Sequence, residues 1–308
     1  MKSQFNHFLS LLPRAIKRIK PLRSGSGILG GPAAAIALLA VLASPPVSAE
    51  RILSSLPFRE SFESNNYSDL LWLSTGATQT WMPTSGWSGG GAAKFTAPSV
   101  EGYAGLGQFL LSGIPVSQRP EQLNVRWLLY QGTTWREFGP GGKLLIMNRE
   151  GNQGRPMIIF RDWTTPDGQT WETIGACDGT VCKYKGGDYW PDGTDTLRMG
   201  NRPLAREAEW ISIELEANTR TGIIRLYIDT QDGQLSGLYV EQPMVDTGPG
   251  GVWSYVDIIG GYMAPNDRAD PNNYFMIDEL VIDSRRIGPP AGFSNAAARP
   301  AAPALLVR

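Results

Sequence analysis

Hydrophobic and polar residues alternate most regularly between Glu209 and Asp229. Apolar side chains recur at every second position over 211–215 and again over 224–228, and this period of two predicts strands with one buried face. Residues 218–222 between them are of the types that form turns. The nearby Glu and Ala residues would suit a helix, but the β-branched residues at strict alternation favour strands. We therefore predict a β-hairpin within a large antiparallel sheet, with three side chains on the face away from the core: Trp210, Glu214 and Glu216.

Short apolar segments separated by Gly- and Pro-containing turns continue along the chain, which has 36 Gly and 23 Pro. No amphipathic helix longer than two turns is predicted. Many strands at regular spacing without helices are typical of a sandwich or jelly roll, and a barrel is the alternative. The further predicted strands are 56–63, 92–97, 123–131, 143–148, 157–162, 169–174, 238–240, 256–262 and 274–283.

The two ends of the chain have a different composition from the middle. Residues 1–49 combine six basic residues and no acid with an apolar Ala/Leu stretch, and they end in the small residues Val47-Ser48-Ala49. These are the three parts of a secretory signal peptide, whereas the apolar stretch is short for a membrane span, which needs about 20 residues. We predict a leader over 1–49, one domain over 50–288 and a disordered Pro- and Ala-rich tail over 289–308. An uncleaved membrane anchor is the alternative for the leader.

Removal of the leader changes the charge and removes the only histidine, His7. Of the 28 basic residues 22 remain beside 29 acidic ones, a formal charge of −7, which argues against nucleic acid or an anionic membrane as a partner. Without histidine the mature chain has no Ser-His-Asp or Cys-His catalysis and no imidazole-based zinc or copper site. The two cysteines, Cys177 and Cys182, lie close together and predict a disulfide in an oxidising compartment.

Four segments together resemble the concanavalin A-like jelly roll shared by legume-type lectins, laminarinase-type glycosidases and a set of polysaccharide lyases. They are FRESFES (58–64), GGAAKFTAP (90–98), EWISIELEANTRTGIIRLYID (209–229) and YFMIDELVIDSRRIG (274–288). The resemblance implies an all-β, concanavalin A-like jelly-roll sandwich of two antiparallel sheets. Within this group, residues 139–163 are similar in layout to a segment of alginate and glucuronan lyases, in which a GGK strand precedes an Arg-bearing strand.

A lyase that cleaves a uronate by β-elimination must neutralise the sugar carboxylate, remove the C5 proton and protonate the leaving oxygen. Arg or Lys can perform the first task, and Tyr near a cation can perform the others. Ordinary solvated polar side chains on outer strand faces are the alternative interpretation. The catalytic candidates are Arg126, Tyr130, Lys143, Arg161, Tyr184 and Lys185.

A glycosidase and a lectin are the other two hypotheses. Glu214 and Glu216 are two apart on one strand, so their carboxyls can approach to roughly 6–7 Å, whereas a retaining pair needs about 5–5.5 Å. A lectin holds flat sugar faces by aromatic stacking and hydrogen bonds. The candidates for substrate binding are Trp135, Trp163, Tyr189, Trp190, Glu214 and Glu216.

No cofactor is required by these hypotheses, but in this fold a structural Ca²⁺ often ties the first strand to the last. The resemblance implies Glu60 and Asp278 as ligands, with a carbonyl near Gly91. A second candidate is the loop with Asn266, Asp267 and Asp270, and solvated turn acids are the alternative in both places.

The sequence therefore predicts a secreted or periplasmic monomer that binds a polysaccharide. Cleavage of a uronate-containing glycan is the sharper hypothesis. A non-catalytic glycan-binding or envelope protein is the rival, and a glycosidase using Glu214 and Glu216 is the second alternative.

Overall fold

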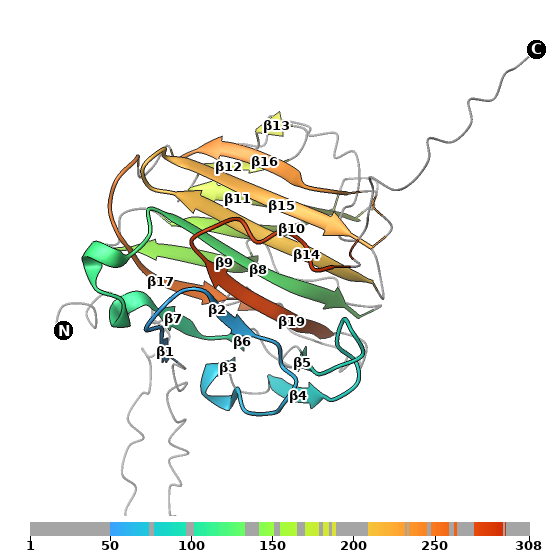
Figure 1. Ribbon diagram of the computed structural model, residues 1–308. Coiled ribbons are helices and arrows are strands. Elements are labelled where there is room, and N and C mark those ends of the chain that lie inside the picture. Colours follow the sequence, from blue (N-terminus) through green and yellow to red (C-terminus); the bar gives the residue numbers. More distant parts are fainter. Residues whose placement is uncertain are drawn as a thin grey trace, which may run out of the picture. The chain divides into compact units, whose positions relative to one another are not determined.

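The computed structural model (Figure 1) divides into two compact units, Met1–Ala43 and Ser44–Arg308, and all described residues belong to the second. The predicted leader, 1–49, and most of the predicted tail therefore lie outside the described part. The described residues are 50–73, 77–96, 102–132, 142–150, 155–164, 170–178, 181–184, 187–188, 209–231, 233, 235–244, 248–258, 262–263, 274–291 and 293.

Two large sheets, called sheet A and sheet B, form the framework of the described part. Sheet A has the order β1 (Glu50–Ile52), β7 (Gln108–Leu110), β17 (Trp253–Ile258), β9 (Gly142–Arg149), β10 (Pro156–Thr164), β11 (Thr170–Asp178), β12 (Val181–Tyr184), β13 (Gly187–Asp188). Sheet B has the order β16 (Leu238–Pro243), β15 (Ile223–Thr230), β14 (Trp210–Asn218), β8 (Gln122–Gln131), β19 (Tyr274–Asp283), β5 (Ala92–Thr96), β4 (Thr78–Met82), and β2 (Phe58–Glu60) also pairs with β19.

The remaining elements are short. A small sheet joins β18 (Tyr262–Met263), β6 (Gly102–Leu106) and β3 (Leu71–Leu73), and three 3₁₀ turns are η2 (Ser68–Leu70), η3 (Leu111–Gly113) and η4 (Val116–Gln118). Within the described residues, no helix is long and apolar enough to cross a membrane.

The prediction of an all-β sandwich of two sheets is confirmed, with one difference in strand direction. Among the described strands all pairings are antiparallel except that of β1 with β7, which is parallel and lies at the edge of sheet A. The sheets pack through one large core, to which alternate residues of both contribute, including Trp127 and Ile213 from sheet B and Met147 and Val256 from sheet A. Because strand side chains alternate between faces, each sheet also has an outer face whose side chains do not contribute to this core.

The predicted hairpin is present as β14 and β15, in direct register from Ile211 with Thr230 to Asn218 with Ile223. In its turn the Asn218 side chain accepts hydrogen bonds from two backbone amides, and Gly222 has φ +65°, a conformation that favours glycine. The local sequence therefore defines the turn and, through it, the register of the two strands.

One part of the hairpin prediction is wrong. Trp210, Glu214 and Glu216 lie on the face of sheet B away from the main core, but they are only 7%, 2% and 4% exposed. A segment that follows β19 is here called the C-terminal strap and comprises residues 284–291 and 293. It binds Glu214 and packs in one cluster with Trp210, whereas Glu216 is bound by side chains of β15. In Figure 1 this segment crosses in front of β8 and β14.

Candidate functional site

The outer face of sheet B carries four of the predicted catalytic or substrate-binding residues, Arg126, Tyr130, Glu214 and Glu216. The register places Arg126 of β8 opposite Glu214 of β14, and Tyr130 opposite Trp210. Residues directly opposite in neighbouring strands share a face, so the structure brings together side chains that the sequence assigns to two different hypotheses.

The C-terminal strap closes this face. The two carboxylate oxygens of Glu214 accept hydrogen bonds from the backbone amides of Ile287 and Gly288, at 2.9 and 2.8 Å. The Arg286 guanidinium lies 3.8 Å from the ring centroid of Tyr227, and Phe293 packs on Trp87. Polar residues that the sequence suggests are open to solvent thus serve to bind another part of the same chain.

Both glutamates of the glycosidase hypothesis accept hydrogen bonds from other groups of the chain. Burial raises the pKa of Glu214, although the two strap amides and Arg286 act to lower it. Glu216 accepts hydrogen bonds from Arg225 at 2.6 Å and from the Tyr227 hydroxyl at 3.3 Å. Both carboxylates are bound by groups of the same chain, so neither is available to a glycan in this structure.

The other predicted site residues belong to sheet A or lie outside the described part. Lys143 is on β9, Arg161 and Trp163 are on β10, and Tyr184 is on β12, with only their backbone described. Trp135, Lys185, Tyr189 and Trp190 lie outside the described residues. The proposed catalytic set is therefore divided between two sheets, since Arg126 and Tyr130 are on sheet B and Lys143 and Arg161 are on sheet A.

The two cysteines face each other across the ladder between β11 and β12, where Cys177 is the partner of Cys182. No cysteine in the described part is free, and Cys177 is disulfide-bonded.

The predicted calcium ligands are in different surroundings. Glu60 accepts a hydrogen bond from the Phe62 amide and lies 3.5 Å from Arg51, while Asp278 accepts from the amides of Trp87 and Glu279. Burial, with Glu279 and Glu63, raises the pKa of Asp278 to about 7. Of the residues described, no three His, Cys, Asp or Glu side chains are grouped to hold a metal ion.

The two carboxyls differ in the charges near them, since those that act on Asp278 are the acids Glu279 and Glu63. The ion pair with Arg51 and the Phe62 amide already compensate Glu60. The second candidate loop, with Asn266, Asp267 and Asp270, lies outside the described residues.

A different polar cluster lies on the outer face of sheet A, and its residues are not among those predicted from the sequence. Here called the β17 cluster, it is built on the register that places Tyr255 opposite Asn148 and Asp257 opposite both Ile146 and Gln108. The remaining member is Arg155, whose charge acts on Asp257 and Tyr255.

The β17 cluster is mostly buried, and only some of its polar atoms have hydrogen-bond partners among the described residues. Asp257 is 7% exposed and Asn148 1% exposed. Within the described residues, neither side-chain atom of the Asn148 amide nor Oδ1 of Asp257 has a hydrogen-bond partner. Native proteins satisfy nearly all buried polar groups, so three such atoms on neighbouring strands indicate a place that takes up water or a ligand.

The pKa values of the two titratable groups Asp257 and Tyr255 in the β17 cluster are both raised, but they stay far apart. Burial raises the pKa of Asp257 to about 7, opposed by the Gln108 hydrogen bond and the Arg155 charge. Burial and then Asp257 raise the pKa of the Tyr255 hydroxyl, opposed again by Arg155. A carboxyl that titrates near neutrality beside a protonated phenol provides a base and an acid at the same pH.

An apolar row borders this cluster. Ile146, Met157 and Cys177 form a separate small cluster of buried residues, and the register aligns them across β9, β10 and β11 with Asp257 on β17. The outer face of sheet A thus has an apolar strip leading to a polar end. The signal available in the sequence was the alternation in WSYVDI, where Tyr255 and Asp257 alternate with Val256 and Ile258.

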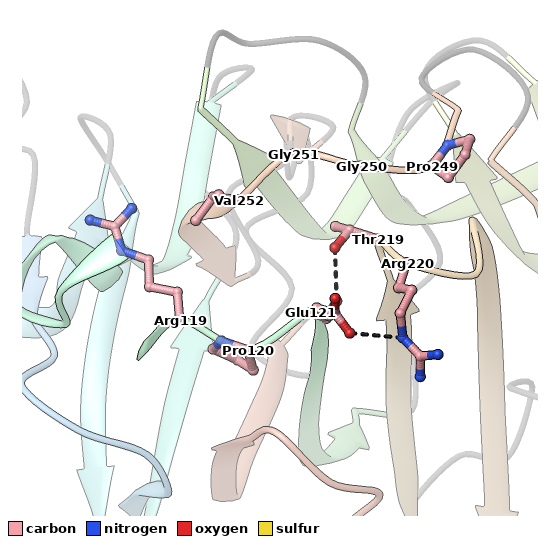
Figure 2. Close-up of a pocket in the computed structure, with 9 residues that line it drawn as sticks. All are labelled: Arg119, Pro120, Glu121, Thr219, Arg220, Pro249, Gly250, Gly251 and Val252. Carbon is pink, nitrogen blue, oxygen red and sulfur yellow. Dashed lines mark hydrogen bonds and ion pairs between the residues drawn. The ribbon is translucent and has the colours of Figure 1, made fainter. Parts of the chain in front are cut away.

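A cavity of about 570 Å³ lies elsewhere, at the strand ends (Figure 2). Its walls come from residues 119–121 before β8, 219–220 in the β14–β15 turn and 249–252 before β17. None of these residues is in the β17 cluster, so the cavity is a separate candidate.

The chain resembles several solved structures at low sequence identity. No family model matches it, and no curated protein does. Solved structures that it resembles include the cellulose-induced protein Cip1, at 18% identity over 76% of this chain and 100% of the other, with TM-score 0.40. An endo-β-1,4-glucuronan lyase from the fungus Trichoderma reesei has 11% identity, 74% and 95% coverage, and TM-score 0.42. Winged bean acidic lectin has 10% identity, 73% and 97% coverage, and TM-score 0.41.

Two of these names, a lyase and a lectin, belong to groups that the sequence resemblance names, and the chain is similar to both in fold. With such low identities and with TM-scores below 0.5, the likeness assigns none of these activities to this chain.

Proposed function

We propose that this protein binds a uronate-containing polysaccharide on the outer face of sheet A and cleaves it by β-elimination at the β17 cluster. The observation that carries the proposal is the juxtaposition of Asn148 and Asp257, buried on neighbouring strands with hydrogen-bonding atoms unpaired among the described residues.

The cluster supplies the contacts that an acidic sugar needs. The Asn148 amide can donate to one hydroxyl and accept from another, and a buried group gains more from such a partner than an exposed one. The Arg155 guanidinium can pair with the uronate carboxylate in a two-pronged arrangement, which a neutral sugar cannot use.

The same residues supply the chemistry. With Arg155 neutralising the carboxylate, the Asp257 carboxylate takes the C5 proton and the electron pair of that C–H bond forms a C4–C5 double bond. The bond between C4 and the glycosidic oxygen breaks, and the Tyr255 hydroxyl gives its proton to that oxygen. Asp257 and Tyr255 are two positions apart on one strand, so they lie ~7 Å apart along it, and positioned acid–base groups contribute typically 10²- to 10⁴-fold each.

These assignments replace part of the predicted catalytic set. Arg126 and Tyr130 lie on sheet B, Arg126 with 3% exposure, so they face away from a substrate on sheet A. Lys143 and Arg161, which the sequence also gives as catalytic candidates, are on β9 and β10 of sheet A, the same sheet as the β17 cluster.

Binding without cleavage is the second candidate function, and the burial of the cluster favours it. At 7% and 1% exposure, Asp257 and Asn148 are better placed to bind hydroxyls than to meet a substrate carbon directly. Residues 1–49 support a secreted or periplasmic location for either function.

The test is incubation of the mature protein with a panel of polyuronates while the ultraviolet absorbance of the unsaturated product is followed. Asp257→Asn and Tyr255→Phe should abolish the rise and retain the fold. The matched controls Asp283→Asn and Tyr274→Phe, both on β19 of sheet B, should retain it. Binding of polyuronate without any absorbance rise would favour the second function, and absence of binding would refute both.

A further inference from the structure

We propose that the cavity of Figure 2 is a second carbohydrate site, which takes one or two units of a neutral sugar. The cavity is formed where β8 begins, β14 turns into β15 and the chain enters β17. Its volume of about 570 Å³ lies within the ordinary range of small-molecule sites. This inference goes beyond the proposed function, because it concerns different residues and a different ligand charge.

Hydrogen bonds between the three segments hold the cavity in shape. The Thr219 amide donates to the Glu121 carbonyl at 2.9 Å, and the Gly250 amide donates to the Thr219 carbonyl at 2.5 Å. The same Glu121 carbonyl accepts from the indole of Trp253, a fully buried side chain, at 3.1 Å. The walls are thus tied to the core, and a ligand meets a preformed site with little ordering cost.

The charges of the cavity are balanced. Arg220 donates to Glu121 at 2.8 Å, and Arg119 donates to Glu150 at 2.7 Å. Arg119 also donates to the carbonyls of Ile114 and Trp253, and its side chain is only 7% exposed. Figure 2 shows its guanidinium directed away from Thr219 and Arg220. With its cations engaged in this way, the cavity offers no net positive charge to an anion.

The accessible groups suit the two kinds of surface on a sugar. The Glu121 and Arg220 side chains are 63% and 69% exposed, so they present acceptors and donors to hydroxyls. The rings of Pro120 and Pro249 provide apolar surface for the C–H face of a sugar ring. Gly250 has φ +100°, and a Cβ atom added to it would meet no heavy atom within 4 Å, so its backbone can be approached closely.

Titration of the full mature chain with cellobiose, maltose and lactose, followed by amide chemical shifts, tests the proposal. We expect at least one disaccharide to shift the amides of residues 219–222 and 250–252 in a saturable manner. Glu121→Ala combined with Arg220→Ala should weaken that binding at least about tenfold, because hydrogen bonds to charged groups are lost. Glu241→Ala, which alters an exposed Arg–Glu pair outside the cavity, should leave it unchanged.

A second variant protects the test against misfolding. Val252→Trp fills the cavity without removing a charge, and it should also abolish the disaccharide shifts while the rest of the spectrum stays native. Asp257→Asn should leave neutral disaccharide binding unchanged, so loss of polyuronate binding and loss of this site are separable. Saturable binding that survives both cavity changes, or no shift with any of the three sugars, would overturn the proposal.

Discussion

The buried carboxyl of Asp257 should make the folded protein less stable as the pH rises. Its pKa is raised from 3.8 to about 7 in the folded state, so the folded chain binds a proton between these values that the unfolded chain has released. The contribution to stability is therefore fully present below the unfolded pKa and is lost as the pH rises through about 7. The shift corresponds to ~4 kcal/mol at most, and at 7% exposure solvent screens little of it.

The substitution Asp257→Asn isolates this effect, because the amide resembles the protonated carboxyl in size. We expect the variant to match the natural protein near pH 4 and to exceed its unfolding free energy by up to ~4 kcal/mol near pH 8. Asp278 has a similarly raised pKa, and it changes the unfolding free energy with pH by the same amount in the natural protein and in the variant. The difference between the two proteins is the quantity to compare.

Urea unfolding monitored by tryptophan fluorescence at several pH values measures both free energies. Equal pH dependence in the two proteins would show that Asp257 titrates normally, and it would remove the base from the proposed lyase mechanism. If the variant is more stable and no longer cleaves polyuronate, then Asp257 lowers the stability of the folded protein and is required for its activity.

Three further predictions concern other parts of the molecule. Glu214→Ala should remove two charge-assisted hydrogen bonds to the strap and lower the unfolding free energy measured in urea by ~3 kcal/mol. Trypsin should then cut faster at Arg285 and Arg286. An unchanged cleavage rate would contradict the anchoring of the strap by Glu214. Calcium should raise the melting temperature of the natural protein but not of Asp278→Asn, and equal melting curves with and without the ion would argue against calcium at this carboxyl. Trp127→Ala should cost about 3–5 kcal/mol, because this fully buried ring lies in the main core, and a cost below about 1 kcal/mol would be inconsistent with that packing.

The sequence predicted the long strands well, because periodicity reports which face is buried. The prediction of 274–283 coincides with β19, and the alternation in the hairpin gave the correct faces. The short strands β1 and β7, with three residues each, carry too little pattern to be identified. Alternation also cannot show what covers the second face of a sheet, which is why Glu214 was expected to be accessible.

The candidate site was harder to predict, since it depends on which strands become neighbours. Arg126 and Lys143 look equivalent along the chain, yet their strands belong to different sheets. Conversely, Asn148 and Asp257 are far apart in sequence, and only the pairing of β9 with β17 joins them. The individual strands can be recognised from local residues, whereas the order of strands in a sheet is a long-range property.

The position of β19 has a consequence for biosynthesis. This strand lies between β8 and β5, although it is made after both of them and after β14 and β15. Until residues 274–283 emerge from the ribosome, β8 has an unpaired edge and the core lacks the side chains of β19, which is a state prone to aggregation. Sheet B therefore closes late, and a nascent chain halted before Tyr274 should remain a client of chaperones.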